Sequence, residues 1–180
     1  MSTAALSETG TGSDSKVLED LSGKYLSFII GKEEYGIEIL SVNEIISIIE
    51  ITSIPNLSDY VKGVINLRGS VIPIVDLRMK FGMPEKEYDK ETCIIVVNLH
   101  GRLMGIIVDT VSEVLDITEE DIDSSLNFGI SVEIDFILGM GKVKDKVVIL
   151  LVIERVLQSK QLAAIHSAAK ELNKMEENNV

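Results

Sequence analysis

Few residues of this 180-residue chain could carry nucleophilic or metal chemistry. The two histidines, His100 and His166, are 66 positions apart, and the single cysteine, Cys93, lies in the apolar run TCIIVV. This spacing supports neither a zinc site nor a cysteine–histidine pair. We therefore expect Cys93 to be a small buried hydrophobic residue and both histidines to be solvated. Glycine-rich phosphate-binding motifs are also missing from the sequence.

Carboxylates are the remaining candidates for chemistry. A small β-barrel hydrolase could use Asp76, Asp109 or Glu113 as an acid–base pair, but nothing in their spacing makes them converge. Asp76 begins the string DLRMKFG and is predicted to cap one helical turn that ends at Gly82. The acidic run 116–123 lacks the ligand order of a calcium loop and is predicted to be solvated. We expect no enzymatic activity, no cofactor and no metal.

Composition and charge limit the possible partners. The chain has 17 basic and 29 acidic residues, a net charge of −12, and only four Tyr, four Phe and no Trp. Nucleic acid and anionic membrane surfaces are therefore unfavourable partners. The longest apolar run, VVILLVI, is far shorter than the roughly 20 residues of a membrane-spanning helix. The first residues resemble no secretory signal, so a cytoplasmic location is expected.

The elements that would have to position any site are mostly short strands. Val- and Ile-rich runs bounded by Gly, Asn, Asp and Pro are typical of an all-β barrel or sandwich. Residues 1–20, rich in Ser, Thr and Gly, are predicted to form a flexible tail. In residues 161–180 the spacing of Leu162, Ile165, Ala169 and Leu172 predicts one apolar helix face, which should cover a barrel face rather than join a coiled coil. Three hairpins are predicted, with turns at 31–33, 100–101 and 144–146.

An internal repeat organises these strands. A shift of 69 positions aligns GIEILSVNEII with GIIVDTVSEVL, and a shift of 76 aligns VKGVINLRGSVIPIVDL with ILGMGKVKDKVVILLVI. We infer two five-stranded units, near residues 24–82 and 92–157, that share one core with a groove between them. The matched pairs are Gly36 with Gly105, Val42 with Val111, Glu44 with Glu113, Gly63 with Gly139, and Arg68 with Lys144.

The strings EEYGIEILSVNEI, VKGVINLRGSVIPIVDLRMKFG and GIIVDTVSEVL resemble the CheW-like family of bacterial chemotaxis. The resemblance is clear from about Tyr25 to Leu157, and we place the family domain at residues 21–160. The resemblance also continues into the terminal helix. It implies two SH3-like five-stranded β-barrels around a common hydrophobic core, plus short helices. It also implies a monomeric, non-catalytic adaptor between the regulatory domain of the histidine kinase CheA and the cytoplasmic tips of methyl-accepting chemotaxis receptors. A related receptor–kinase pathway, such as pilus motility, is the alternative.

The resemblance also implies site residues. The receptor-facing set lies in and beside the predicted groove, and the kinase-facing set lies at exposed barrel ends. Asp123 departs from the family pattern, in which a basic residue can occur at this position. The receptor-facing residues are Val42, Glu44, Gly63, Arg68, Val111 and Val114, and the kinase-facing residues are Ile39 and Phe128.

The residues alone support simpler roles for several members of this set. By periodicity Val42 and Val111 belong to a core, and Glu113 is a solvent-facing strand residue. Gly63 serves backbone geometry. Arg68 is a hairpin turn residue, so Arg68→Ala should leave the fold nearly intact. The resemblance adds that this substitution should weaken receptor-dependent kinase control.

Overall fold

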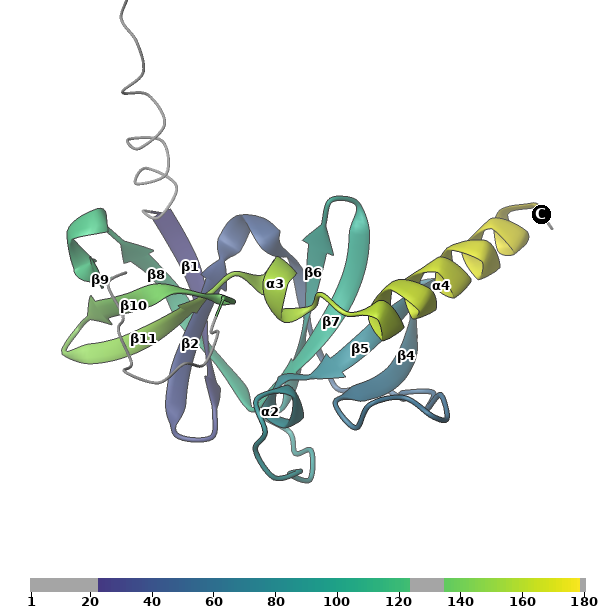
Figure 1. The fold of residues 1–180 in the computed structure, drawn as a ribbon, viewed down its shortest axis with the longest axis horizontal. Coiled ribbons are helices and arrows are strands. Elements are labelled where there is room, and N and C mark those ends of the chain that lie inside the picture. The colour runs from purple at the N-terminus through teal and green to yellow at the C-terminus, as the bar shows by residue number, and fades with distance from the viewer. Residues whose placement is uncertain (1–22, 124–134, 179–180) are drawn as a thin grey trace, which may run out of the picture.

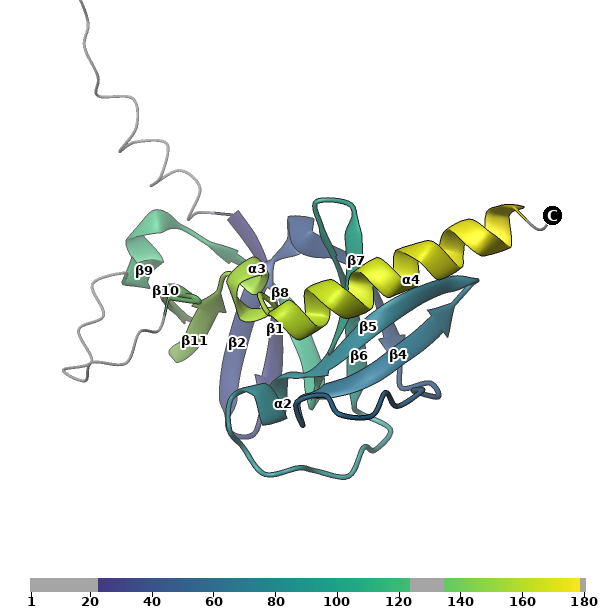
Figure 2. The same cartoon turned by 45° about the vertical axis from the view of Figure 1, so that its right-hand side comes forward.

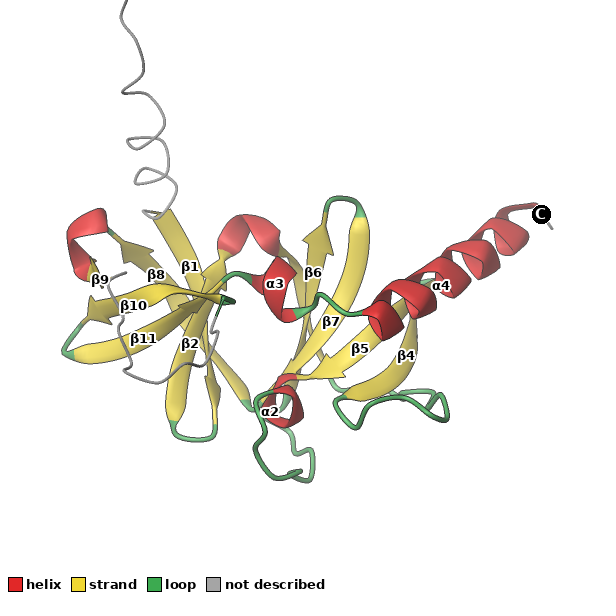
Figure 3. Cartoon of the chain, in the orientation of Figure 1, coloured by secondary structure: helices red, strands yellow, loops and turns green. Residues whose placement is uncertain are grey.

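The computed structural model describes residues 23–123 and 135–178, and strands dominate it (Figures 1 and 3). The first half contains β1 (Gly23–Ile30), β2 (Glu33–Glu38), the 3-10 helix η1 (Ile39–Ser41), β3 (Val42–Ser47), β4 (Val61–Leu67), β5 (Ser70–Asp76) and α2 (Leu77–Lys80). The second half contains β6 (Cys93–Leu99), β7 (Arg102–Val108), β8 (Thr110–Ile117), the 3-10 helix η2 (Glu119–Asp121), β9 (Ile122–Asp123), β10 (Ile137–Val143), β11 (Lys146–Leu151), α3 (Ile153–Val156) and α4 (Lys160–Asn178). All three predicted hairpin turns are confirmed.

The strands form two sheets of matching order. One runs β8-β1-β2-β11-β10-β9 and is called the six-stranded barrel; the other runs β3-β6-β7-β5-β4 and is called the five-stranded barrel. Each contains one parallel pair at the equivalent place, β2 with β11 and β7 with β5. The predicted all-β class with two SH3-like barrels is confirmed, except that the two-residue β9 gives one barrel a sixth strand.

The predicted division into consecutive barrels, 24–82 and 92–157, is wrong. The hairpin β1–β2 belongs with β8–β11, and the hairpin β6–β7 belongs with β3–β5 (Figure 1). The two repeats therefore exchange their first hairpins, and each barrel contains strands from both. Hydrophobic periodicity locates strands but carries no information on which strands pair, so the sequence repeat could not reveal this exchange.

A shared core joins the barrels, as predicted. Its largest cluster of buried side chains includes Leu26 and Phe28 of β1 together with Ile95 and Val97 of β6. Each barrel also has its own smaller cluster, with Ile65, Ile72, Ile74, Ile94, Val96 and Ile107 in the five-stranded barrel and Tyr25, Leu115, Ile117, Val148 and Leu150 in the other. Because strands of both repeats line the shared cluster, neither repeat could bury it alone.

The terminal helix α4 lies along β5 of the five-stranded barrel (Figure 2). Leu162, Ile165 and Ala169 of the predicted apolar face are buried, and Leu162 and Ile165 join the shared core. Leu172, predicted to complete that face, is 53% exposed, because the helix extends past the sheet. The predicted covering role therefore holds for the first part of α4.

Candidate functional site

Seven of the eight predicted site residues lie in the described part of the chain, and they are spread over both barrels. Val42 and Glu44 are in β3, Gly63 is in β4, and Arg68 is in the turn between β4 and β5, so these four belong to the five-stranded barrel. Val111 and Val114 are in β8 of the six-stranded barrel, and Ile39 is in η1. Phe128 lies outside the described residues.

The structure brings two of these residues into direct contact. The Arg68 guanidinium donates through Nη2 to Oε1 of Glu44 in a close ion pair across the barrel surface. The Arg68 side chain is 71% exposed and that of Glu44 is 26% exposed. An ion pair this exposed contributes little to stability, so both groups are available to a partner at small cost to the fold.

The β4–β5 turn sets the direction of the Arg68 side chain. Arg68 and Gly69 have φ values of 52° and 89°, so two successive residues adopt the left-handed conformation that suits a tight hairpin. The Asn66 Oδ1 atom accepts from the Gly69 amide at 2.9 Å and fixes the turn. The predicted turn role of Arg68 is therefore correct, and the turn places its side chain beside β3.

The other barrel repeats this ion pair. Lys144 and Asp145 have φ values of 51° and 63°, and the Lys144 ammonium lies 3.1 Å from a Glu113 carboxylate oxygen. Hydrogen bonds from Lys144 and Lys146 hold the pKa of Glu113 below its usual value. The repeat aligned the two glutamates and the two cations separately. It missed that each glutamate pairs with the cation of its own repeat, although their opposite charges were a usable signal.

A glycine is required at position 63 because the backbone of Thr52 lies very close to it. Its φ is 134°, and a Cβ atom there would lie 1.9 Å from the Thr52 carbonyl oxygen. At this point the chain closes the five-stranded barrel, because Thr52 and Val64 exchange two backbone hydrogen bonds of 2.8 and 3.0 Å. The prediction that Gly63 serves backbone geometry is therefore confirmed, and its effect on any partner would be indirect.

The valines divide into half-buried and exposed members. Val42 and Val111 are half-buried and pack against the shared core. Val114 is 49% exposed, and Ile45, which lies 69 positions earlier and so at the matched place on β3, is 43% exposed. Ile45 was not among the residues predicted from the sequence, although the repeat shift of 69 positions applied to Val114 leads to it. Each of these two residues directly follows the paired glutamate of its strand, so its side chain points to the opposite face and leaves apolar area exposed there.

Of the two predicted kinase-facing residues, Ile39 lies within the described part of the chain, as does Asp123, the position that departs from the family pattern. Ile39 is half-buried against the shared core, while its neighbour Leu40 is 92% exposed. Asp123 is exposed on β9, and its backbone pairs with Met140 of β10. Leu40 is therefore the side chain of η1 that a partner could reach, a residue that sequence reasoning did not select.

The carboxylates considered for hydrolysis have separate structural contacts. Asp76 accepts from the Met79 amide at 3.2 Å, which confirms the predicted N-cap of α2, and from the Tyr88 hydroxyl at 2.8 Å. Burial, followed by the contact with Asp76, raises the pKa of Tyr88 well above its usual value. Glu113 is paired with lysines on the other barrel, so these groups do not converge.

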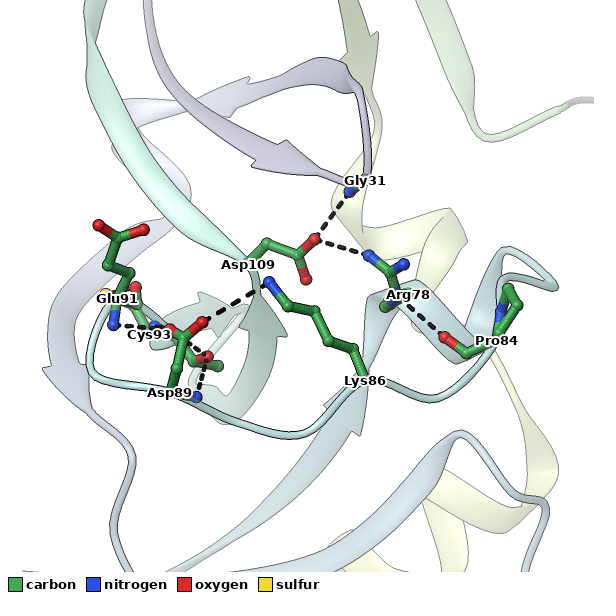
Figure 4. Close-up of polar contacts among 9 residues, drawn as sticks. Gly31, Arg78, Pro84, Lys86, Asp89, Glu91, Cys93 and Asp109 are labelled. Carbon is green, nitrogen blue, oxygen red and sulfur yellow. Dashed lines mark hydrogen bonds and ion pairs between the residues drawn. The ribbon is translucent and has the colours of Figure 1, made fainter.

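Asp109 links the barrels (Figure 4). Its Oδ2 atom accepts from the Gly31 amide at 2.8 Å and from Arg78 Nη1 at 2.7 Å. Gly31 is in the β1–β2 turn of the six-stranded barrel, whereas Arg78 is in α2, directly after β5. Arg78 also donates through Nε to the Pro84 carbonyl at 2.9 Å. Asp109 therefore holds the junction between the barrels.

Two classes of site are not seen in the described part of the chain. Within residues 23–123 and 135–178, no group of three or more His, Cys, Asp or Glu residues could hold a metal ion. No helix among these same residues is both long and apolar enough to cross a membrane.

Comparison with known proteins points to one family. Residues 24–161 match the model of the CheW-like domain. The chain is 41% identical over 152 residues to the chemotaxis protein CheW of Klebsiella aerogenes, covering 84% of this chain and 92% of that protein. It is 36% identical to the Helicobacter pylori chemotaxis protein CheW, covering 84% and 90%. The crystal structure of the scaffolding protein TtCheW from Thermoanaerobacter tengcongensis aligns with a TM-score of 0.69 at 32% identity, covering 77% of this chain and 94% of that one.

Proposed function

The chain belongs to the CheW-like family, and on that premise we propose that it is a non-catalytic adaptor that couples methyl-accepting chemotaxis receptors to the histidine kinase CheA. The observation that carries the proposal is the match of residues 24–161 to the CheW-like domain. In this role the protein works in the cytoplasm as a monomer and is recruited to receptor arrays at the membrane. It needs no cofactor, because its task is to hold two partners in one geometry.

We propose the β3 surface and its neighbours as the receptor contact. The Glu44–Arg68 ion pair supplies charge, the half-buried Val42 lies on the same face of β3 as Glu44, and Ile45 exposes apolar area on the other face; charge beside apolar area suits the amphipathic helices of a receptor tip. Val111 and Val114 of β8 extend the contact to the other barrel across the predicted groove. Val42 packs against the shared core beneath this surface, and Gly63 permits the close pairing of Thr52 with Val64 that closes the barrel.

Kinase contacts would come from the barrel ends. Ile39 packs inward, and it sets the position of the exposed Leu40 side chain in η1. A fully exposed leucine is a suitable anchor for a hydrophobic pocket on the CheA regulatory domain. Phe128 remains the second proposed kinase contact.

Reconstitution tests the adaptor role directly. Receptor-containing vesicles, CheA and this protein are combined, and the rate of CheA autophosphorylation is measured. The unaltered protein should raise receptor-dependent kinase activity. A protein that binds neither receptor tips nor the CheA regulatory domain in separate pull-downs, and leaves kinase activity unchanged, would overturn the proposal.

The matched cations of the two barrels provide a paired variant test of the receptor contact. Arg68→Ala should lower receptor-dependent kinase activity by about fivefold or more, as expected for an interface arginine. Lys144→Ala removes the equivalent cation from the six-stranded barrel and should leave the activity nearly unchanged. Equal losses in both variants would contradict the assignment, and so would a circular dichroism spectrum showing that Arg68→Ala unfolds the protein.

A further inference from the structure

A hollow of about 640 Å³ lies between α4 and the five-stranded barrel. Its walls are the start of β5 (Ser70–Ile72), the β6–β7 turn with the start of β7 (100–103), and one side of α4. An adjoining hollow of about 440 Å³ shares His100, Arg102 and His166 with it. These volumes are in the range of binding pockets, and none of the proposed receptor or kinase contacts within the described residues lines either hollow.

The larger hollow is positively charged in a strongly acidic protein. Arg102, Lys170 and Lys174 line it together with both histidines, and no aspartate or glutamate is among its described lining residues. Among the side chains that the structure describes, none of these three cations forms a salt bridge. The chain carries a net charge of −12, so this local concentration of unpaired positive charge is opposite in sign to the protein as a whole.

The floor of the hollow is apolar and fixed. Ile72 and Ala169 are buried in it, and Leu103 and Val71 are half-buried. The Asn173 Oδ1 atom accepts from the Val71 amide at 3.2 Å, which ties α4 to β5 beside the hollow. The hollow is therefore formed by elements that are packed and hydrogen-bonded to each other.

The pKa of His166 responds to the positive charge of the hollow. Its Nδ1 atom is buried and has no hydrogen-bond partner among the described residues. Burial, and after it the positive charges of Arg102 and Lys170, lower the pKa of His166 below its usual value. A negatively charged group placed in the hollow would offset the positive charges of Arg102 and Lys170.

We propose that this hollow binds an acidic segment of a partner protein, with carboxylates on the cationic rim and aliphatic side chains on the apolar floor. Charge complementarity selects an acidic occupant, since Arg102, Lys170 and Lys174 can each pair with a carboxylate. The partly exposed Val71 and Leu103 side chains of the floor select a peptide over a small inorganic anion, because a small anion leaves that apolar surface in water.

Fluorescence anisotropy with the full chain tests the proposal. The probe is a short labelled peptide with blocked ends in which glutamate alternates with leucine. It should bind saturably, more weakly as salt is added, and more tightly than a peptide in which glutamate alternates with serine. Lys170→Glu should weaken binding by at least about fivefold, because attraction is replaced by repulsion.

Lys160→Glu is the matched control. Lys160 is an exposed lysine of the same helix that does not line the hollow, so the substitution changes the net charge equally and should weaken binding by less than about twofold. Equal weakening by the two variants, equal affinity for the leucine and serine peptides, or no saturable binding by the unaltered protein would each overturn the proposal. Far-ultraviolet circular dichroism checks that α4 is intact in both variants.

An NMR pH titration of His166 gives an independent readout. The charged groups around it are Arg102, Lys170 and Lys174, with His100 and its ion-paired Glu154 at the adjoining hollow. Saturating peptide should raise the pKa of His166, because carboxylates favour the imidazolium. The chain has two histidines, so His166→Gln assigns the signal. An unchanged pKa with bound peptide would place the peptide elsewhere and reject this site.

Discussion

The two barrels share strand order, parallel pair and turn geometry, but they use the shared frame differently. On the five-stranded barrel one arginine meets one glutamate, and α4 covers β5 beside the turn. On the six-stranded barrel Glu113 contacts two lysines, and Lys146 also contacts Glu34 at 3.0 Å. Duplication has therefore preserved the positions of the strands and of the charged turn, while the side chains on them and the added helix make the two surfaces chemically distinct.

The matched valines of β5 and β11 show the same difference. The Val71 amide donates to Asn173 of α4, and Val71 is half-buried. Val147 lies 76 positions later, at the matched place on β11, and is 49% exposed. The six-stranded barrel therefore keeps open the place that α4 occupies on its counterpart.

The matched glycines at the barrel seams should give the largest difference between the barrels. At Gly63 an added Cβ atom meets the Thr52 oxygen at 1.9 Å and φ is positive, whereas at Gly139 the nearest atom, the Asp123 oxygen, is 3.0 Å away. Gly63→Ala should lower the free energy of unfolding by about 3–5 kcal/mol and Gly139→Ala by about 1 kcal/mol. Urea denaturation measures both, and equal losses would show that the two seams are equally tight.

The second-largest difference in unfolding free energy should come from substitutions at the matched positions 40 and 109. Asp109 is 16% exposed and ion-paired with Arg78, whereas Leu40, 69 positions earlier, is 92% exposed. Asp109→Asn should cost about 1–3 kcal/mol of unfolding free energy, because it leaves the Arg78 charge unpaired at the junction. Leu40→Asn should stay within about 0.5 kcal/mol. A large loss from Leu40→Asn in the same denaturation series would refute the view that, of these two matched positions, only Asp109 stabilises the junction.

The smallest effect concerns the pH dependence of the six-stranded barrel's ion pair. Because Lys144 and Lys146 lower the pKa of Glu113, this carboxylate contributes stability above its unfolded-state pKa and loses it as pH falls through the lowered folded-state value. Lys144→Gln should therefore shift the urea midpoint slightly downward near neutral pH, and this shift should fade as pH falls through the lowered folded-state pKa of Glu113. A shift that persists in acid would show that Lys144 acts through packing instead.

Local features were predictable from the sequence, and pairing between distant segments was not. The turns at 31–33, 100–101 and 144–146 depend on neighbouring residues, as does the Asp76 cap. The exchange of hairpins depends on which strands meet, and the Glu44–Arg68 pair joins residues 24 positions apart in sequence. The exposed side chains at Ile45 and Leu40 escaped prediction for a similar reason. Exposure depends on what the fold leaves uncovered, and an aliphatic residue in a strand reads as core by default.

The exchanged hairpins also set an order in which the chain can fold. Strands β3–β7 occupy the continuous stretch 42–108, so the five-stranded barrel can close as soon as that stretch has been synthesised. The six-stranded barrel must wait, because Ser27 of β1 bonds to Glu113, 86 residues later, and β2 pairs with β11 at the far end of the domain. Such long-range closure is slow and leaves strand edges open meanwhile. On the ribosome, β1–β2 would therefore be the first strands made and among the last to find their partners.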